Sequence, residues 1–302
     1  MEASVVIPFY NAEATLERAV NSVLAQEGVS LQIILIDNNS TDRSNAIAQN
    51  YASKHSNISL YNESKQGANN ARNLGLSLAK YDWIQYLDAD DELLPKKIYN
   101  QLSIIDLDKI DVICSPISEY TNKGAVINYK VSEMDDIWLS LLYGKIGWTC
   151  SNLWRASALR FVGGWNLNYT SHQEKELMAR LIIEGKNFYF YDQSECKVYE
   201  QSKSISTRAD FPLTGIKFMK FITHHLESTN QMNTKRKKAI HTQLYHKYLM
   251  AYKINPEEAK NAMYRTELNL DIIDLPVHHQ LLINTFDRHI AFWLLRLFRN
   301  RK

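Results

Sequence analysis

Apolar residues in the first part of the chain form short dense segments separated by stretches with helical spacing. The dense segments have the length of strands that are buried on both faces of a sheet. They lie at 4–7, 33–36, 58–61, 83–87 and 111–115. Between them, apolar positions recur every three or four residues, which predicts helices at 12–26, after Ser40 or Thr41, and at 68–79. This alternation predicts an α/β fold with a mostly parallel sheet and helices on both of its faces.

The pattern changes twice along the rest of the chain. From about 116 to 205 it is mixed, with helices expected at 134–143 and 174–184 and strands at 187–191 and 196–199. After Ser206 helical spacing dominates. The helices expected there are 212–227, 235–252, 256–267 and 281–299. We therefore predict two domains, an α/β domain over 1–206 and a helical region over 207–302.

Polar clusters follow three of the predicted strands at the point where each strand ends. Ligands of parallel α/β sheets bind beyond the carboxyl ends of the strands, so these clusters predict a binding site there. The clusters are Tyr10-Asn11, Asp37-Asn38-Asn39 and Asp88-Ala89-Asp90-Asp91.

Composition narrows the class of protein. Hydrophobic residues make up 45% and charged residues 23%, as in soluble globular proteins, and the net charge of +2 gives no indication of a nucleic-acid partner. The three cysteines are widely spaced and form no CxxC pair, which favours a reducing cytoplasm. The sequence has no signal-peptide pattern and no apolar run of about 18 residues, so we expect neither a leader nor a membrane-spanning helix.

The carboxylates of Asp88 and Asp90 give the strongest chemical signal. Crowded carboxylates repel one another, and a bound cation relieves that repulsion. Hard oxygen ligands suit Mg²⁺ or Mn²⁺, which typically also hold substrate phosphates. The alternative is that Asp91 and Glu92 stabilise the first turn of a helix. The segment alone leaves both open.

Two further segments carry weaker signals. Asp37 ends a buried strand and can accept a hydrogen bond from a base or a ribose, but a turn followed by a helix cap explains the same residues. Arg72 lies near the start of a predicted helix and can bind an anion, although an exposed helical arginine is the simpler interpretation.

Together these segments resemble the family 2 glycosyltransferases, which have the GT-A fold. The chain reads V-I-P-F-Y-N from Val6, I-D-N-N-S-T-D from Ile36, N-N-A-R-N-L-G from Asn69 and L-D-A-D-D from Leu87. The order and the intervals match the family pattern, and the resemblance covers about residues 3–205. It implies an inverting transfer from a nucleotide-diphospho-sugar with a divalent metal, and a GT-A (Rossmann-like) domain over 1–206. The lack of GxGxxG, GxxxxGK[ST] and GxSxG motifs argues against dehydrogenases, P-loop enzymes and hydrolases.

The resemblance implies roles for individual residues. Asp37 and Asn38 would read the base edge, Arg72 would contact the nucleotide or its phosphates, and Asp90 would bind Mn²⁺ or Mg²⁺. Asp88 would reach the ribose or a metal-bound water. The other residues expected to line the nucleotide-sugar site are Pro8, Tyr10, Asn11 and Ala89.

The chain departs from the family pattern at Asn38 and Asn39, where an acid and a glycine are usual. An Asn oxygen still accepts a hydrogen bond from a base N–H, so a uracil nucleotide stays open. We expect Asn39 to be left-handed. The family's histidine after the last strand of this domain is also missing, and Glu200 or Lys203 are the residues in that stretch that could replace it.

The resemblance also implies an acceptor side. Val162-Gly163-Gly164-Trp165-Asn166 matches a turn near the acceptor cleft, and Glu174 falls on the position of the catalytic base. Trp165 and His172 are further candidates for acceptor or sugar contacts, whereas Glu176 is expected to be structural. The implied acceptor is a hydroxyl of a glycan or lipid-linked molecule in bacterial surface polysaccharide synthesis, and UDP is the expected nucleotide. A hexosyl or an N-acetylhexosaminyl group would be transferred. The rival hypothesis is a non-catalytic nucleotide-sugar-binding or assembly subunit.

The C-terminal region contains two basic segments that bear on binding partners. The basic run 235–238 is typical of a solvated helix face. Residues 281–299 combine aromatic and apolar positions with a basic end, which suits a helix on the inner face of the cytoplasmic membrane. Docking on the protein's own core or in a homo-oligomer explains the same pattern.

Overall fold

The computed structural model describes residues 1–104, 106–201, 208–264, 268–274 and 279. Two compact units make up the chain, Met1–Ser202 and Lys203–Lys302, and each is described by itself. The predicted boundary at 206 falls among residues 202–207, and the predicted helix 281–299 falls beyond residue 279, so both lie outside the described residues.

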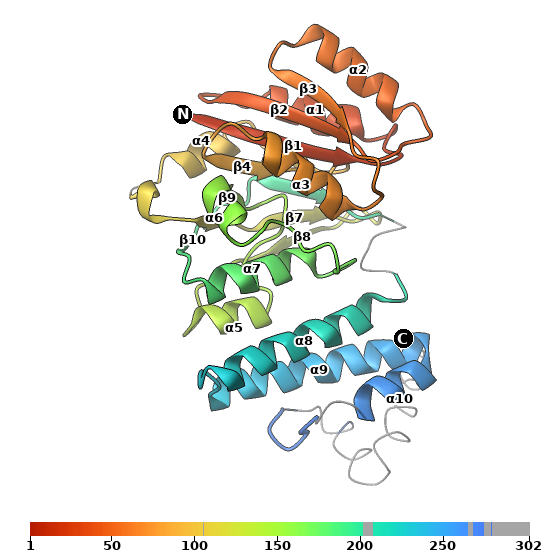
Figure 1. Ribbon diagram of the computed structural model, residues 1–302, viewed down its shortest axis with the longest axis vertical. Coiled ribbons are helices and arrows are strands. Elements are labelled where there is room, and N and C mark those ends of the chain that lie inside the picture. The colour runs from red at the N-terminus through yellow and green to blue at the C-terminus, as the bar shows by residue number, and fades with distance from the viewer. Residues whose placement is uncertain (105, 202–207, 265–267, 275–278, 280–302) are drawn as a thin grey trace. The chain divides into compact units, whose positions relative to one another are not determined.

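A sheet of seven strands forms the centre of the first unit (Figure 1). Its strands follow the spatial order β10-β6-β9-β4-β1-β2-β3. Their bounds are β1 Glu2–Phe9, β2 Ser30–Asp37, β3 Ile58–Asn62, β4 Trp83–Tyr86, β6 Val112–Cys114, β9 Leu153–Arg155 and β10 Phe188–Phe190. Every pairing is parallel except those of β9, which runs antiparallel to both β4 and β6. The predicted α/β class with a mostly parallel sheet is therefore confirmed.

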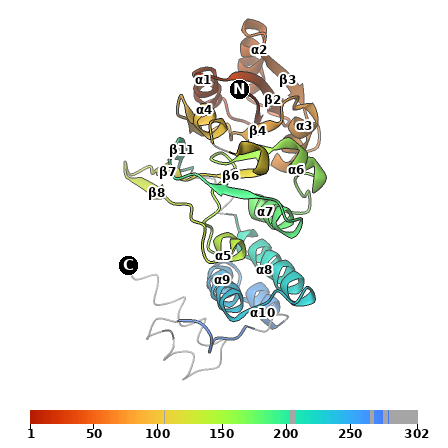
Figure 2. The same ribbon diagram turned by 90° about the vertical axis from the view of Figure 1, so that its left-hand side faces the viewer.

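Helices cover both faces of this sheet (Figure 2). Val5 and Ile7 point into a core shared with α1 and α4. Val6 lies on the opposite face and contacts α3. The contact is so close that a Cβ atom added to Gly75 of α3 would lie 2.3 Å from the Val6 side chain. Gly75 is thus the residue that lets α3 lie close against β1. The helices of this unit are α1 Leu16–Leu24, α2 Ser44–Lys54, α3 Ala68–Leu78, α4 Lys97–Leu102, α5 Ile137–Leu142, α6 Ala156–Phe161 and α7 Gln173–Ile183, with a 3₁₀ turn η1 at Leu107–Lys109.

A second sheet of four strands adjoins the acidic motif. Its spatial order is β5-β11-β7-β8, and β5 begins directly after Asp91. The bounds are β5 Glu92–Leu93, β7 Ile117–Tyr120, β8 Val126–Tyr129 and β11 Cys196–Tyr199. This sheet brings the end of β11 next to the motif, although the two are about a hundred residues apart in the sequence.

The second unit is helical within its described residues. It contains α8 Phe211–Ser228, α9 Thr234–Ile254 and α10 Pro256–Tyr264. Asn233 caps α9 by accepting a hydrogen bond from the Arg236 N–H at 2.9 Å. In the part of the chain that the structure describes, no helix is long and apolar enough to cross a membrane.

Candidate functional site

The carboxyl ends of β1, β2 and β4 meet at one edge of the large sheet. The backbone N–H of Asn38 donates to the Phe9 carbonyl at 2.9 Å, and that of Leu87 donates to the Val6 carbonyl at 3.0 Å. The three polar clusters of the sequence therefore come together, as their positions predict. Within them Pro8 and Ala89 are buried, whereas the Tyr10 ring is 52% exposed.

The end of β2 is held by its own polar side chains. Asp37 is buried and accepts hydrogen bonds from the Ser40 N–H at 2.9 Å and the Asn45 amide at 2.7 Å. Asn39 has φ 66°, which confirms the predicted left-handed conformation. Asn11 is also left-handed, with φ 49°, and its Oδ1 accepts from the Thr41 N–H at 2.8 Å. The loops after β1 and β2 therefore support each other.

The buried side chain of Asn38 connects the loop after β2 to the loop before α3 by hydrogen bonds. Its amide donates to the carbonyls of Glu63 and Lys65, both at 2.8 Å, and its Oδ1 accepts from the Gly67 N–H at 2.7 Å. A carboxylate cannot donate these two hydrogen bonds, so Asn at this position is required by the loop that it closes.

Arg72 links three of the motifs. Its Nη2 donates to Oδ1 of Asp88 at 2.8 Å, and its Nη1 donates to Oε1 of Gln173 at 2.8 Å. The guanidinium lies over the Trp165 ring, 4.7 Å from its centroid. Because Arg72 is only 4% exposed, it is a buried element of the site and the simpler alternative of an exposed helical arginine is wrong.

The acidic motif carries strong mutual repulsion. Burial, together with the charge of Asp88, raises the pKa of Asp90 to about 6. Burial also raises the pKa of Asp91, with contributions from Asp88 and Asp90, while the Cys150 thiol and the Tyr199 N–H hydrogen-bond to its carboxyl group. The charge of Asp88 thus disfavours the ionised forms of both Asp90 and Asp91, which makes the motif a favourable place for a cation.

One cation reaches this motif from α1, a contact that the sequence pattern does not reveal. The Arg18 guanidinium donates to the Asp90 carbonyl and lies over the Tyr199 ring, 3.8 Å from its centroid. The Tyr199 hydroxyl in turn donates to Glu92 at 2.8 Å. A positive charge near Asp90 lowers the pKa of that carboxyl group, in opposition to burial.

The motif is also supported from the protein interior. Lys97 is fully buried, donates a hydrogen bond to Gln85, and has its pKa lowered to about 7 by burial. Gln85 donates to the backbone carbonyl of Cys150 at 2.7 Å. This places a second, buried basic group behind the segment whose thiol contacts Asp91.

Helix α7 brings the predicted base and its neighbours to the same region. Glu174 lies in the first turn of α7, directly after Gln173, the residue bonded to Arg72. His172 is buried and left-handed at the start of the helix, and its Nδ1 lies 3.2 Å from the Ser171 hydroxyl. Glu176 forms a 2.9 Å ion pair with Arg180 and accepts from Asn166 at 2.8 Å, consistent with the structural role expected of it.

Trp165 lies beneath the site. It is 1% exposed and packs edge-on against the Tyr86 ring at 5.2 Å. Asn73 holds the Trp165 backbone by two hydrogen bonds, of 2.7 and 2.8 Å, and Asn69 donates to the Asn166 carbonyl at 2.8 Å. The geometry therefore favours an indirect role for Trp165, as support for Arg72. Asn69 and Asn73 were missed, although their i, i+4 spacing on the helix that carries Arg72 is the signal that could have found them.

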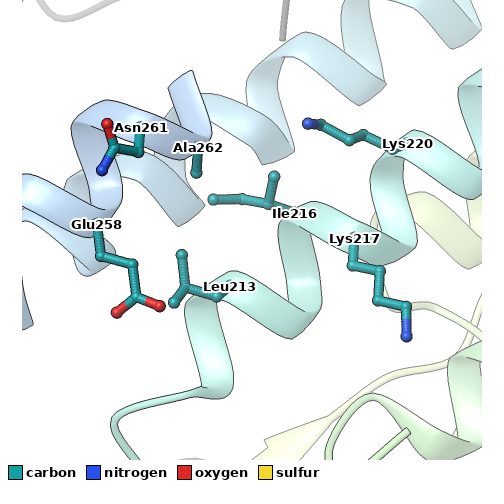
Figure 3. A pocket seen from close by; sticks show the side chains of 7 residues that line it. All are labelled: Leu213, Ile216, Lys217, Lys220, Glu258, Asn261 and Ala262. Atoms are coloured by element: carbon teal, nitrogen blue, oxygen red, sulfur yellow. The ribbon is translucent and has the colours of Figure 1, made fainter. Parts of the chain in front are cut away.

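Two surface pockets are found among the described residues, one in each unit. One, of about 510 Å³, adjoins the glycine turn of the first unit and is lined by residues such as Asn73, Gly164, Asn168 and Arg180. The other, of about 420 Å³, lies between α8 and α10 of the second unit (Figure 3). Its lining combines apolar residues of both helices with Asn261 and three charged residues, Lys217, Lys220 and Glu258. Neither contains the acidic motif.

The carboxylates of the acidic motif fit a divalent cation. Their oxygens are the donors that Mg²⁺ and Mn²⁺ prefer, and the pKa of Asp90 is raised by burial and by the charge of Asp88, both of which a bound cation would offset. Among the described residues, no three His, Cys, Asp or Glu side chains converge as a complete metal site. The motif therefore fits an ion whose remaining ligands come from water and a bound diphosphate, because Mg²⁺-type ions keep several such ligands.

Comparison with known proteins identifies the class. Residues 4–162 match the model of the family described as "Glycosyl transferase family 2". This match spans more than half of the chain, so the protein belongs to that family.

The chain is also similar in sequence to individual proteins. The minor teichoic acid biosynthesis protein GgaB of Bacillus subtilis is 36% identical over 119 residues, which are 38% of this chain and 13% of GgaB. The first relatives found match over only 13–41% of their own length.

Solved structures share the fold at low sequence identity. Staphylococcus aureus TarS in complex with UDP-GlcNAc has a TM-score of 0.59 at 15% identity, covering 90% of this chain and 77% of that one. The mannosyltransferase PcManGT of Pyrobaculum calidifontis, in complex with GDP-Man and Mn²⁺, has a TM-score of 0.55 at 14% identity, with 99% and 88% covered. The GT-A fold expected from the sequence is confirmed.

Proposed function

We propose that this protein is an inverting glycosyltransferase that moves a sugar from a nucleotide-diphospho-sugar to an acceptor hydroxyl. The observation that carries the proposal is the buried Arg72, which hydrogen-bonds Asp88 of the acidic motif and Gln173, the neighbour of Glu174. One side chain thus ties the donor-side carboxylates to the helix that carries the proposed base. Family membership supports the reaction class.

The nucleotide is proposed to bind at the edge formed by the ends of β1, β2 and β4. The exposed Tyr10 ring offers a face for the base, with Pro8 and Asn11 beside it and Asp37 near the ribose or base edge. The Asn38 amide already closes a loop, so base recognition falls to its neighbours. Structural neighbours bind UDP-GlcNAc and GDP-Man, and we favour a UDP-sugar for this chain.

Asp90 is the proposed protein ligand of a divalent ion, with Asp88 beside it. When bound, such an ion neutralises the charge that grows on the leaving diphosphate. PcManGT was solved with Mn²⁺, which supports Mn²⁺ or Mg²⁺ here. Arg72 pairs with one carboxylate oxygen of Asp88 at 2.8 Å, so this side chain is held at the edge of the acidic motif.

Glu174 is the proposed general base. Its place in the first turn of α7 leaves it partly exposed, and no hydrogen bond from a described residue to its carboxylate is found. A free carboxylate there can take the proton from an acceptor hydroxyl as that oxygen attacks the anomeric carbon from the face opposite the diphosphate.

The proposed acceptor is a glycan or a lipid-linked glycan of a bacterial surface polysaccharide. GgaB, a relative, takes part in minor teichoic acid biosynthesis, which supports an envelope polymer. The proposed transferred group is a hexosyl or an N-acetylhexosaminyl group.

Donor turnover tests this function. Purified protein is incubated with UDP-GlcNAc, UDP-Glc, UDP-Gal and GDP-Man in the presence of Mn²⁺, with and without glycan acceptors, and free nucleoside diphosphate is measured. An enzyme releases nucleotide from at least one donor. Binding of a donor without any release would support the non-catalytic alternative.

We also propose that the C-terminal unit contacts an anionic membrane surface. Residues 203–302 contain seventeen Lys and Arg against eight Asp and Glu, a net charge of +9, whereas residues 1–202 carry −7. Basic residues near an anionic bilayer contribute about 1 kcal/mol each. Full-length protein should float with phosphatidylglycerol vesicles but not with phosphatidylcholine vesicles, and high salt should release it. No flotation with either would remove this proposal.

A further inference from the structure

We propose that Arg18 is a positioning residue for the metal-dependent step of donor binding. The proposal rests on the function proposed above and adds a residue that none of the four sequence motifs assigns. Arg18 lies in α1, about seventy residues before the acidic motif, yet its Nη2 donates to the backbone carbonyl of Asp90.

The contact fixes the backbone of the residue that would bind the ion. A carbonyl held by a guanidinium cannot rotate freely, and the Asp90 carboxylate is carried on the same residue. Groups that orient a metal ligand through one intervening contact are important for affinity, although they never touch the ion.

Arg18 is itself held in one place by aromatic stacking. Its guanidinium lies 3.8 Å from the centroid of Tyr199, and the Tyr199 ring stacks on Tyr120 at 5.4 Å with an interplanar angle of 28°. The Tyr199 hydroxyl donates to Glu92 at 2.8 Å, and Lys197 pairs with the same carboxylate at 3.0 Å. Arg18 therefore connects α1, the acidic motif and the end of β11.

The end of β11 is where the sequence lacks the histidine expected from the family pattern. Tyr199 occupies this region, and it contributes a ring that supports a cation and a backbone N–H that hydrogen-bonds to Asp91. Arg18 therefore contacts the backbone of Asp90, and Tyr199 contacts both Arg18 and Asp91.

Four variants separate positioning from simple structural support. Arg18→Met removes the charge and the donor, and Arg18→Lys keeps the charge without the planar stack. Tyr199→Leu removes the ring, and Arg43→Met is the matched control. Arg43 is an exposed arginine whose contact is an ion pair with Glu13.

The readout is the dissociation constant of nucleoside diphosphate, measured by isothermal titration in the presence of MnCl₂ and again in EDTA. The nucleotide is whichever of UDP, GDP, dTDP and CDP the wild-type protein binds best with Mn²⁺. Arg18→Met should weaken binding in Mn²⁺ by about tenfold or more, the range seen when an outer-shell partner of a metal ligand is lost. Binding in EDTA should stay unchanged.

The other variants complete the test. Arg18→Lys and Tyr199→Leu should fall between wild type and Arg18→Met, and Arg43→Met should match wild type. Equal weakening with and without Mn²⁺, or no weakening of an Arg18→Met protein that unfolds like wild type, would overturn the inference. If the wild type itself binds no nucleotide in Mn²⁺, the proposed function fails instead, so the two failures are distinguishable.

Discussion

Arg72 donates a 2.8 Å hydrogen bond to the Asp88 carboxylate, and the two side chains are 5% and 37% exposed. The pair therefore joins a buried cation to an anion at the edge of the site. Removing one member of such a pair leaves the other charge without its partner. The resulting loss of folding stability is larger than the stability that the intact pair contributes.

Arg72→Met is expected to lower the free energy of unfolding by about 1–3 kcal/mol, a range reduced from that of fully buried pairs because Asp88 is partly solvated. Urea denaturation measures this. The double variant Arg72→Met with Asp88→Asn should be less destabilised than the sum of the two single variants. Strict additivity would contradict the coupling.

The hydrogen bonds by which the Asn38 side chain connects two loops give a second prediction. Asn38→Asp restores the acid that is usual in the family, but it places a carboxylate oxygen against the carbonyls of Glu63 and Lys65. Loss of two buried donors should reduce the free energy of unfolding by about 1–3 kcal/mol. The exposed Asn50→Asp is the control. A variant as stable as the control would mean that the loop has another arrangement, in which the side chain of residue 38 can hydrogen-bond the nucleotide base.

Asp90 links pH to stability. Its pKa is raised from 3.8 to about 6 in the folded protein. At pH values between these two, the folded state therefore keeps a proton on Asp90 that the unfolded state has lost. Its contribution to the metal-free fold is therefore most favourable below about pH 4 and is lost as the pH rises through about 6.

Asp90→Asn should accordingly stabilise the metal-free protein at neutral pH, by up to about 3 kcal/mol at ~1.4 kcal/mol per pKa unit. Below about pH 4 the two proteins should unfold alike. Urea denaturation in EDTA at both pH values checks this. A variant that is less stable than wild type at neutral pH would show that ionised Asp90 has a favourable partner in the folded state.

Glu174→Gln tests the assignment of the base. The substitution should lower kcat for transfer by at least ~10²-fold, because a general base typically contributes that much or more. Nucleotide affinity should persist. Glu184→Gln, at the exposed end of the same helix, serves as the control. Transfer at a near-normal rate by Glu174→Gln would remove Glu174 from the reaction.

Much of the fold follows from the sequence because buried parallel strands give dense apolar segments. Strands β1, β2, β3 and β4 occur where these segments predict them, and β1 continues through Pro8 to Phe9. Strand β9 was missed, since three residues are too few to show periodicity and its antiparallel place in the sheet is decided by long-range pairing. The short helices α4 and α6 and strand β8 were missed for the same reason of length.

The candidate site was predictable in part. The motif residues converge because they end neighbouring parallel strands. What the motifs do not reveal is which side chains join them. The contact of Arg18 with Asp90 spans 72 positions and that of Arg72 with Gln173 spans 101, and both depend on how α1, α3 and α7 pack. The closure of a loop by Asn38 likewise depends on carbonyls 25 and 27 positions away.

The central claim is a metal-dependent site for a nucleoside diphosphate at the acidic motif. Thermal unfolding of the full chain with UDP, GDP, dTDP and CDP, each with Mn²⁺ and with EDTA, tests it most directly. A ligand at a hundred times its dissociation constant adds about 2.7 kcal/mol of stability, which gives a clear shift of the midpoint. We predict a shift with at least one nucleotide, UDP first, that is clearly larger in Mn²⁺ than in EDTA, and in Asp90→Asn this difference between Mn²⁺ and EDTA should disappear. No shift with any nucleotide, or a difference between Mn²⁺ and EDTA that Asp90→Asn retains, would contradict the account.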